Sequence, residues 1–173
     1  MSGSSTRSGA SVVAERTEAG RRTYRSLFGA VALGWLVLDQ LTKAWAVHAL
    51  EGSPVSVVWT LRFDLAYNSG ASFSMGTGAG PWIALGVLVI VAVLIWSARS
   101  VSTRLAAVAM GMIVGGALGN LGDRLFRGDA GFLHGSVVDF IDLQWWPVFN
   151  VADIGVVCGA ILLVIASFSG AGT

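Results

Sequence analysis

Charged residues are scarce in this chain of 173 residues. Asp, Glu, Lys and Arg make up 12% of it, against roughly 25% in a typical soluble domain, and hydrophobic residues make up 54%. The mean hydropathy is +0.72. A chain of this length cannot bury so much apolar surface in a core of its own, so the excess must face lipid. The composition therefore argues against a water-soluble fold.

Cysteine and histidine are almost absent, and positive charge is not concentrated on any one face. The single cysteine, Cys158, can form neither an intrachain disulfide nor a multi-cysteine metal site. The two histidines do not stand in a His-Glu-x-x-His spacing, which argues against a zinc peptidase. The net charge of +1, without an extended basic face, argues against nucleic-acid binding. We therefore expect no cofactor, no metal and no nucleic-acid partner. We also expect a monomer, although none of these features determines the oligomeric state.

Four apolar stretches cover most of the remaining sequence, at about residues 26–47, 81–98, 105–121 and 150–168. Each is close to the ~20 residues that a membrane-spanning helix needs. The sequence therefore predicts an α-helical integral membrane protein with four transmembrane helices over residues 26–169. Residues 1–25, rich in Ser, Gly, Thr and Arg, predict a disordered basic tail in the cytoplasm.

The distribution of arginine predicts the orientation in the membrane. Seven of the ten arginines lie in the tail or in the short link after the second apolar stretch, and positive residues stay on the cytoplasmic side. Both termini are thus expected in the cytoplasm, with outer loops at about 48–80 and 122–149. In the first outer loop, polar and apolar residues alternate over residues 60–65, which predicts a strand in a small sheet on the outer leaflet.

Polar residues recur near the outer ends of three predicted helices. A rise of ~1.5 Å per residue brings them to one level within the outer part of the membrane. Polar groups at this depth usually face the protein interior and have a function. They are Asp39, Lys43, Asn120, Asp123, Arg124, Asn150 and Asp153.

Several of these residues also have a purely structural interpretation. Asp39 and Lys43 are four residues apart, as in an ion pair that also reaches toward the interface. Asn150 and Asp153 fit an N-cap followed by an acidic residue in the first helical turn. The aspartates that we expect to be solvated are Asp123, Asp129 and Asp142.

Asp139 is the least easily explained by structure alone. It lies within an apolar segment, Val137 to Ile141, that returns a carboxylate to the membrane surface only 14 residues before Asp153. Two carboxylates at one site share a proton, so one can act as base toward water while the other acts as acid. The pair Asp139 and Asp153 is therefore a candidate for aspartyl protease chemistry.

Other functions remain open from the residues alone. A serine peptidase would use Ser69 or Ser72 together with one of the two histidines, His48 and His134. A Gly-x-Gly-Asp intramembrane protease is a further possibility, although Gly119 and Gly122 stand one residue too far apart for that motif. The remaining classes are a small proton-coupled transporter and a non-enzymatic membrane assembly protein.

Five short motifs in chain order resemble those of the lipoprotein signal peptidases. They are LDQLTK (38–43), NSGASF (68–73), GNLGDRL (119–125), VVDFI (137–141) and FNVAD (149–153). The resemblance covers about residues 26–168. It departs slightly from the family pattern at Ser72 and Gly155, and Gly155 is expected to loosen the start of the fourth helix.

The resemblance implies both a reaction and a set of site residues. The family cleaves diacylglyceryl-modified prolipoproteins before the lipid-bearing cysteine, in the bacterial cell membrane and without a metal. The implied partners are thus a lipid-modified prolipoprotein and membrane lipid. The catalytic pair would be Asp139 and Asp153, near the extracytoplasmic face. The implied supporting residues are Asn68, Gly70, Asn120, Arg124 and Asn150, with Asp39 and Lys43 stabilising the site.

Overall fold

The computed structural model describes residues 9–69, 80–127 and 135–169, and within these four α-helices dominate the chain. They are α1 (Gly9–Ala49), α2 (Gly80–Ser97), α3 (Arg104–Phe126) and α4 (Val151–Ser169), with a short 3-10 turn η2 (Ala98–Ser100) after α2. Three contain a segment long and apolar enough to cross a membrane: Arg22–Ala49, α3 and α4. In α2 the described apolar helix, Ala84–Ser100, is shorter. The expectation of a helical membrane protein is confirmed.

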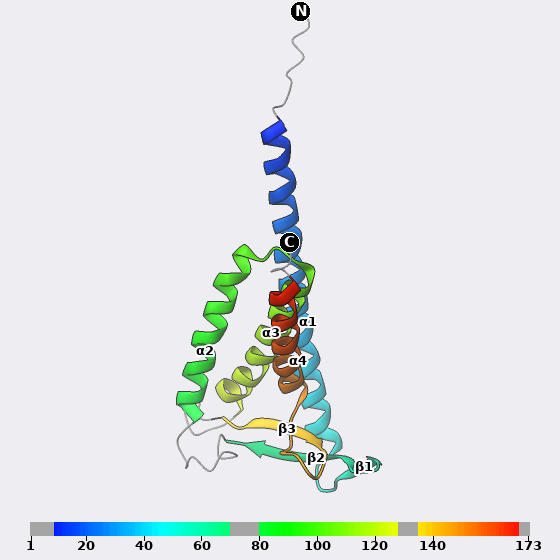
Figure 1. Cartoon of the computed structure of the whole chain (residues 1–173). Coiled ribbons are helices and arrows are strands. Elements are labelled where there is room, and N and C mark those ends of the chain that lie inside the picture. The colour runs from blue at the N-terminus through cyan, green and yellow to red at the C-terminus, as the bar shows by residue number, and fades with distance from the viewer. Residues whose placement is uncertain (1–8, 70–79, 128–134, 170–173) are drawn as a thin grey trace, which may run out of the picture.

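Helix α3 is the most buried of the membrane-spanning helices, and α1 and α4 pack against it (Figure 1). Glycines allow this close approach, because a Cβ atom on Gly115 would collide with the backbone oxygen of Ala32 in α1. A Cβ atom on Gly116 would likewise collide with the backbone oxygen of Ala152 in α4. Small residues on one helix therefore hold the polar ends of three helices close together.

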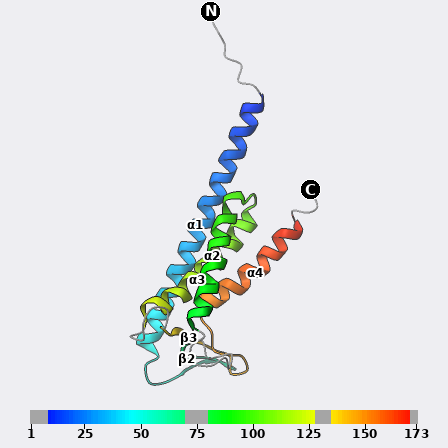
Figure 2. The same ribbon diagram turned by 90° about the vertical axis from the view of Figure 1, so that its left-hand side faces the viewer.

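A three-stranded antiparallel sheet lies across one end of the helices, opposite the end where α1 begins and α4 finishes (Figures 1 and 2). Its order is β1 (Val55–Val58), β2 (Leu61–Asn68) and β3 (Val137–Asp142). The strand expected at residues 60–65 is confirmed as part of β2. Phe140 and Phe63 pack on Ala46 at the end of α1, so the sheet is attached to the bundle through apolar contacts.

Two boundaries differ from the sequence expectation. Residues 9–25 are helical rather than disordered, because alanine, glutamate and arginine in this region favour the helix and extend α1 outward. Helix α3 continues to Phe126 rather than ending near residue 121. Its polar residues Asn120 and Asp123 face the protein interior, where they find partners, so they do not end the helix.

Candidate active site

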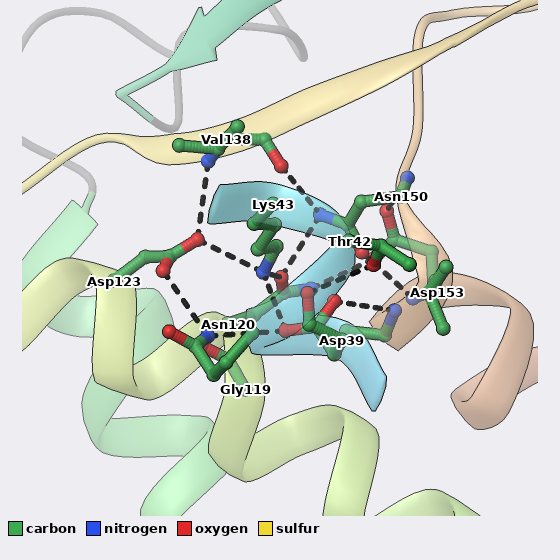
Figure 3. Close-up of polar contacts among 12 residues, drawn as sticks. Asp39, Thr42, Lys43, Gly119, Asn120, Asp123, Val138, Asn150 and Asp153 are labelled. Atoms are coloured by element: carbon green, nitrogen blue, oxygen red, sulfur yellow. Dashed lines mark hydrogen bonds and ion pairs between the residues drawn. The ribbon is translucent and has the colours of Figure 1, made fainter. Parts of the chain in front are cut away.

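Polar side chains from α1, α3, β3 and α4 meet at one level just beneath the sheet (Figure 3). Asp39, Asn150, Asp123 and Asp139 are at most 3% exposed. The convergence expected from helix depth is therefore present, and the strand β3 contributes the fourth element. A cluster this well buried must have each polar group paired to remain stable.

Lys43 is the positive centre of this cluster. Its Nζ atom lies 2.9 Å from an Asp39 oxygen, 2.8 Å from an Asp123 oxygen and 2.8 Å from the Asn120 Oδ1 atom. The ammonium group has three protons, so these three acceptors use all of its donors. Lys43 and Asp39 are both fully buried, so the ion pair expected from their spacing is present but does not reach toward the interface.

The contact with Lys43 determines how the Asn120 side chain is oriented. An ammonium group can only donate, so the amide must turn its oxygen toward Lys43 and its nitrogen the opposite way. The Asn120 Nδ2 atom then donates to the Asp153 Oδ1 atom at 2.8 Å. The buried charge of Lys43 on α1 thus determines that Asn120 turns its amide nitrogen toward the Asp153 carboxylate.

Asn150 is oriented by the same logic from the other side. Its Oδ1 atom accepts the backbone N–H of Asp153 at 3.0 Å, while the Asp153 carboxylate accepts the backbone N–H of Asn150 at 3.1 Å. This reciprocal pair confirms the expected N-cap of α4. The Asn150 Nδ2 atom is left to donate to the Asp139 Oδ1 atom at 2.6 Å. Asn150 therefore binds both candidate catalytic carboxylates, Asp139 through its side-chain amide and Asp153 through its backbone N–H.

Asp139 occupies a buried position on β3 and accepts two amide donors. The second donor is the Asn68 Nδ2 atom on β2, 3.1 Å from the Asp139 Oδ2 atom. Burial raises the pKa of Asp139 to about 6, with the nearby charge of Asp153 acting in the same direction. The hydrogen bonds from Asn68 and Asn150 oppose this rise. Asp139 therefore titrates near neutral pH, as a general acid or base should.

Both carboxylates line a single cavity of about 300 Å³. Arg124 lines it as well and donates from a terminal nitrogen to the Asn120 backbone oxygen at 3.2 Å. The Arg124 Nε atom is buried without a hydrogen-bond partner among the described residues. The cavity thus combines two carboxylates, a positive charge and an unused donor, enclosed by apolar side chains of α2 and α3. Its lining includes Ala84, Val87, Ile90, Ile113 and Ala117.

Asp39 and Asp123 hold the elements that carry the carboxylates. The Asp39 Oδ1 atom accepts the backbone N–H of Ala152 at 2.9 Å, which places a negative charge at the N-terminus of α4. The Asp123 Oδ2 atom accepts the backbone N–H of Val138 at 3.1 Å, next to Asp139 (Figure 3). Asp123 is thus a buried partner of β3, and the expectation that it is solvated was wrong.

Asp142 is not solvated as expected, and Gln40, for which no role was expected, contributes hydrogen bonds to the cluster. Asp142 is buried and ion-paired with Arg62 at 2.6 Å, because β2 and β3 bring the two residues opposite each other. Gln40 donates to Asp39 and to the Gly119 backbone oxygen. A polar side chain beside Asp39 in an apolar helix was the available signal. The residues that fall outside the described part of the chain are Gly70, Ser72, Asp129 and His134.

Gly155 and Trp35 form a close contact between α4 and α1 that was not expected from the sequence. A Cβ atom on Gly155 would overlap the Trp35 indole ring, whose Nε1 atom donates to the Val151 backbone oxygen at 3.0 Å. Gly155 therefore lets α1 support the first turn of α4 rather than loosening it. A tryptophan in the middle of an apolar helix was the signal, because a buried indole N–H usually finds an acceptor.

The fold and the cavity define a membrane-embedded enzyme, and comparisons with known proteins identify its family. Residues 31–169 match the family described as Signal peptidase (SPase) II. The chain is 49% identical over 142 residues to the lipoprotein signal peptidase of Mycobacterium tuberculosis (strain H37Rv), covering 81% of this chain and 70% of the relative. It is 44% identical over 137 residues to that of Rhodococcus jostii, covering 78% and 69%.

Two solved structures share the fold. Both are described as bacterial membrane enzymes solved by the in meso method, at 1.9 and 2.3 Å resolution. The first has a TM-score of 0.68 and 28% identity over 79% of this chain and 89% of that chain. The second has a TM-score of 0.70 and 26% identity over 83% and 88%. The chain belongs to the signal peptidase II family and is a peptidase of the membrane.

Proposed function

We propose that this protein removes the signal peptide from lipid-modified prolipoproteins as an aspartyl endopeptidase, with Asp139 and Asp153 as the catalytic pair. The observation that carries the proposal is the shared cavity that both carboxylates line. Within the part of the chain that the structure describes, each carboxylate oxygen accepts one hydrogen bond. Each oxygen therefore keeps a second lone pair for water, a proton or substrate.

The proposed reaction follows from a single proton shared by the pair. With one carboxyl protonated and the other ionised, the ionised group takes a proton from water, and the oxygen of that water attacks the scissile carbonyl. The protonated group gives its proton to the carbonyl oxygen. When the tetrahedral intermediate collapses, the C–N bond breaks and the leaving amine takes the proton of the protonated carboxyl. A hydroxyl group of the intermediate gives its proton to the other carboxylate as the carbonyl reforms, so the pair regains its single proton. The two protonation steps belong to the coupled pair rather than to either residue alone.

Asn68, Asn120, Asn150 and Arg124 support this chemistry in different ways. The three asparagines donate to the carboxylates, which favours at least one ionised form despite burial. Arg124 contributes a positive charge close to the oxygen on which negative charge develops. Gly70, the remaining family residue, lies outside the described part of the chain. We assign Asp39 and Lys43 to holding these groups in place rather than to the reaction itself.

The location of the site in the membrane is part of the proposal. The arginine bias puts both termini in the cytoplasm, so the sheet and the cavity lie at the extracytoplasmic face. A substrate anchored by acyl chains presents its scissile bond near the membrane surface, the level at which the polar side chains converge. The protein would thus meet its substrate by lateral diffusion within the bilayer.

Substitution of the carboxylates tests the reaction. Asp139→Asn and Asp153→Asn should each lower turnover of a diacylglyceryl-modified signal peptide by at least about a thousandfold, equivalent to ~4 kcal/mol of transition-state stabilisation. The double variant should be little worse than either single variant, because residues acting as a unit lose their effect together. Mass spectrometry of the products in detergent identifies the cleaved bond.

Asp64→Asn is the matched control for these variants. Asp64 lies on β2 and is about one-third exposed, whereas Asp142 is buried and unsuitable. The control should keep full activity. Among the described residues, no three His, Cys, Asp or Glu side chains form a metal-binding group. Substantial activity in either single variant, or activity lost with chelator and restored by zinc, would contradict the metal-free aspartyl mechanism.

Cysteine labelling tests the orientation. In a Cys158→Ala background, a cysteine replacing Ser53, in the turn before β1, should react with an impermeant reagent in intact cells. A cysteine replacing Ser169, at the end of α4, should react only after the membrane is opened. Labelling of residue 169 from outside would show that the assignment of the termini is wrong.

A further inference from the structure

A second hollow begins at the same catalytic carboxylate and runs over the outer surface of α4. It is a groove of about 420 Å³, and Asp153 lines both this groove and the cavity described above. Among the described residues that line it, Asp153 is the one charged side chain. Its apolar walls include Leu143, Trp145, Trp146, Phe149 and Val157.

The wall opposite α4 is a rigid loop between β3 and α4. Phe149 pairs with Ile141 through backbone hydrogen bonds of 2.8 and 3.1 Å, which closes the loop at its base. Gln144 adopts a positive φ of 66° and donates its backbone N–H to Asp142 at 2.6 Å and its side-chain amide to the Thr60 oxygen at 2.9 Å. The loop is therefore attached to the sheet at three points. It holds Trp145 and Trp146 beside α4, with their rings edge to face.

The two hollows that meet at Asp153 differ in chemistry. The cavity contains Asn68, Asn120 and Arg124, which can donate hydrogen bonds to a peptide backbone. Among the described residues that line the groove, the donors are the indole N–H groups of Trp145 and Trp146 and the weak Cys158 thiol, and none is an amide or a guanidinium. Its floor is exposed, with Val157 58% exposed. A peptide segment needs the hydrogen-bond donors of the cavity, whereas a hydrocarbon chain needs the apolar surface of the groove.

We propose that the groove along α4 binds an acyl chain of the lipid-modified substrate residue. This inference rests on the proposed function, in which the lipid-bearing residue directly follows the scissile bond. When the scissile bond lies at the carboxylate pair, the lipid-bearing residue of the substrate lies next to Asp153. The groove begins at this point. The signal peptide then occupies the cavity between α2 and α3, and the acyl chain leaves along α4 into the bilayer. The two tryptophans form the wall that separates the chain from water.

A bulky residue in the groove tests the inference against a matched control. Val157→Trp fills the groove, whereas Val89→Trp adds the same bulk on α2 at a valine that is also 58% exposed but lines neither hollow. Two substrates are compared, one signal peptide carrying two palmitoyl groups and the same peptide carrying two acetyl groups. Thermal unfolding of both variants in detergent checks that each is folded.

The expected result is a selective loss in Val157→Trp. Its KM for the dipalmitoyl peptide should rise at least about tenfold, the effect of displacing roughly two methylene groups from an apolar site. Its kcat, and both constants for the diacetyl peptide, should stay near those of the unmodified protein. Val89→Trp should retain the preference for the longer chains. An unchanged preference in a folded Val157→Trp variant would overturn the acyl-chain assignment and leave the proposed function intact.

Cross-linking gives a second readout that does not depend on turnover. A dipalmitoyl peptide with a photoreactive group in the first few carbons of one acyl chain is bound to the Asp139→Asn variant and irradiated. The label should appear within residues 143–158, and Val157→Trp should abolish it. Labelling of α2 instead would overturn the assignment. If the unmodified protein cleaves neither peptide, the proposed function itself is wrong, and the inference falls with it.

Discussion

Two clusters in this protein each place one cation between two carboxylates, but in very different surroundings, and in the inner cluster Asp123 also pairs with Arg127 at 2.8 Å. Lys43 lies between Asp39 and Asp123, and the three side chains are 0%, 0% and 1% exposed. Arg62 lies between Asp64 and Asp142 on the sheet, where it is 37% exposed and Asp64 is 35% exposed. The inner cluster joins α1 and α3 and reaches β3 and α4 through hydrogen bonds. The outer cluster joins only β2 and β3.

The difference shows how burial turns an ion pair into a positioning device. A buried charge without a partner is very unfavourable, so each donor and acceptor around Lys43 has one geometry that satisfies all of them. That geometry orients the amide of Asn120 toward Asp153. Water can replace any partner of Arg62, so the outer cluster imposes no comparable constraint. The inner cluster is therefore the one that controls the candidate catalytic pair.

Removal of the inner cation should have the largest effect on stability. Lys43→Met keeps most of the length of the side chain but leaves the buried Asp39 carboxylate without its counter-charge and Asp123 with Arg127 alone. We expect the free energy of unfolding to fall by about 3–5 kcal/mol, the range for breaking a buried ion pair. Chemical denaturation in detergent, followed by tryptophan fluorescence, measures the change.

A second substitution separates charge from packing in this experiment. Adding Asp39→Asn to Lys43→Met removes the carboxylate that has lost its counter-charge, so the double variant should lose less than the sum of the two single variants. A Lys43→Met protein with wild-type stability and no turnover would contradict the structural role. Lys43 would then belong to the reaction.

Asp139 and Asp142, three residues apart on β3, should affect the pH dependence of stability in different ways. Burial raises the pKa of Asp139 from 3.8 to about 6, so its contribution to stability is complete below pH 3.8 and is lost as the pH rises through 6. The loss amounts to about 3 kcal/mol by pH 7. Asp139→Asn removes this titration. Relative to the unmodified protein, the variant should therefore gain about 3 kcal/mol of stability between pH 4 and pH 7.

The pKa of Asp142, in the same strand, is shifted in the opposite direction. The backbone N–H of Gln144 and the Arg62 guanidinium hold the pKa of Asp142 below 3.8, so its contribution is present above that pH and is lost on acidification. Unfolding curves of Asp142→Asn should thus differ in pH dependence from those of the unmodified protein only below about pH 4. Equal pH profiles for the two variants would contradict the assigned burial of Asp139.

The sequence predicted the level of the site better than its connections. The polar residues of α1, α3 and α4 were predictable because helix rise converts residue number into depth. The pair Asp39 and Lys43 was predictable from its four-residue spacing. An aspartate within an apolar run indicated that Asp139 lies near the membrane surface. The sequence did not predict the strand β3 that carries it, because pairing of β3 with β2 joins residues about 70 positions apart.

Solvation was the property that sequence context predicted worst. Asp123 stands at a helix end and Asp142 stands beside a loop, and such contexts usually indicate exposed carboxylates. Both are buried, because their partners Lys43 and Arg62 come from segments about 80 residues away. Local sequence does not contain that information. The same limit explains why Gly155 was interpreted as a loosening residue when its role depends on Trp35.

Glycine substitutions extend the comparison to packing, with a smaller effect. Gly155→Ala should displace the Trp35 indole and weaken its hydrogen bond to Val151, lowering the free energy of unfolding by about 1–3 kcal/mol. Gly122→Ala on α3 is the control, because nothing lies within 4 Å of its new Cβ atom. That variant should gain up to about 1 kcal/mol from helix propensity. A gain in Gly155→Ala would mean that the glycine only loosens α4.

The outer cluster should give the smallest effect. In Arg62→Ala, the buried Asp142 loses its ion-pair partner but keeps the hydrogen bond from the Gln144 backbone, while water can solvate Asp64, which is about one-third exposed. The unfolding midpoint should change far less than in Lys43→Met, and the remaining difference should shrink in high salt because exposed charges are screened. Turnover should stay at the wild-type level, since no contact of Arg62 reaches the Asn120 and Asn150 amides that hold the two carboxylates. Unfolding curves and turnover measured at low and high salt test both statements. A loss as large as that of Lys43→Met, insensitive to salt, would mean that burial is not what distinguishes the two clusters.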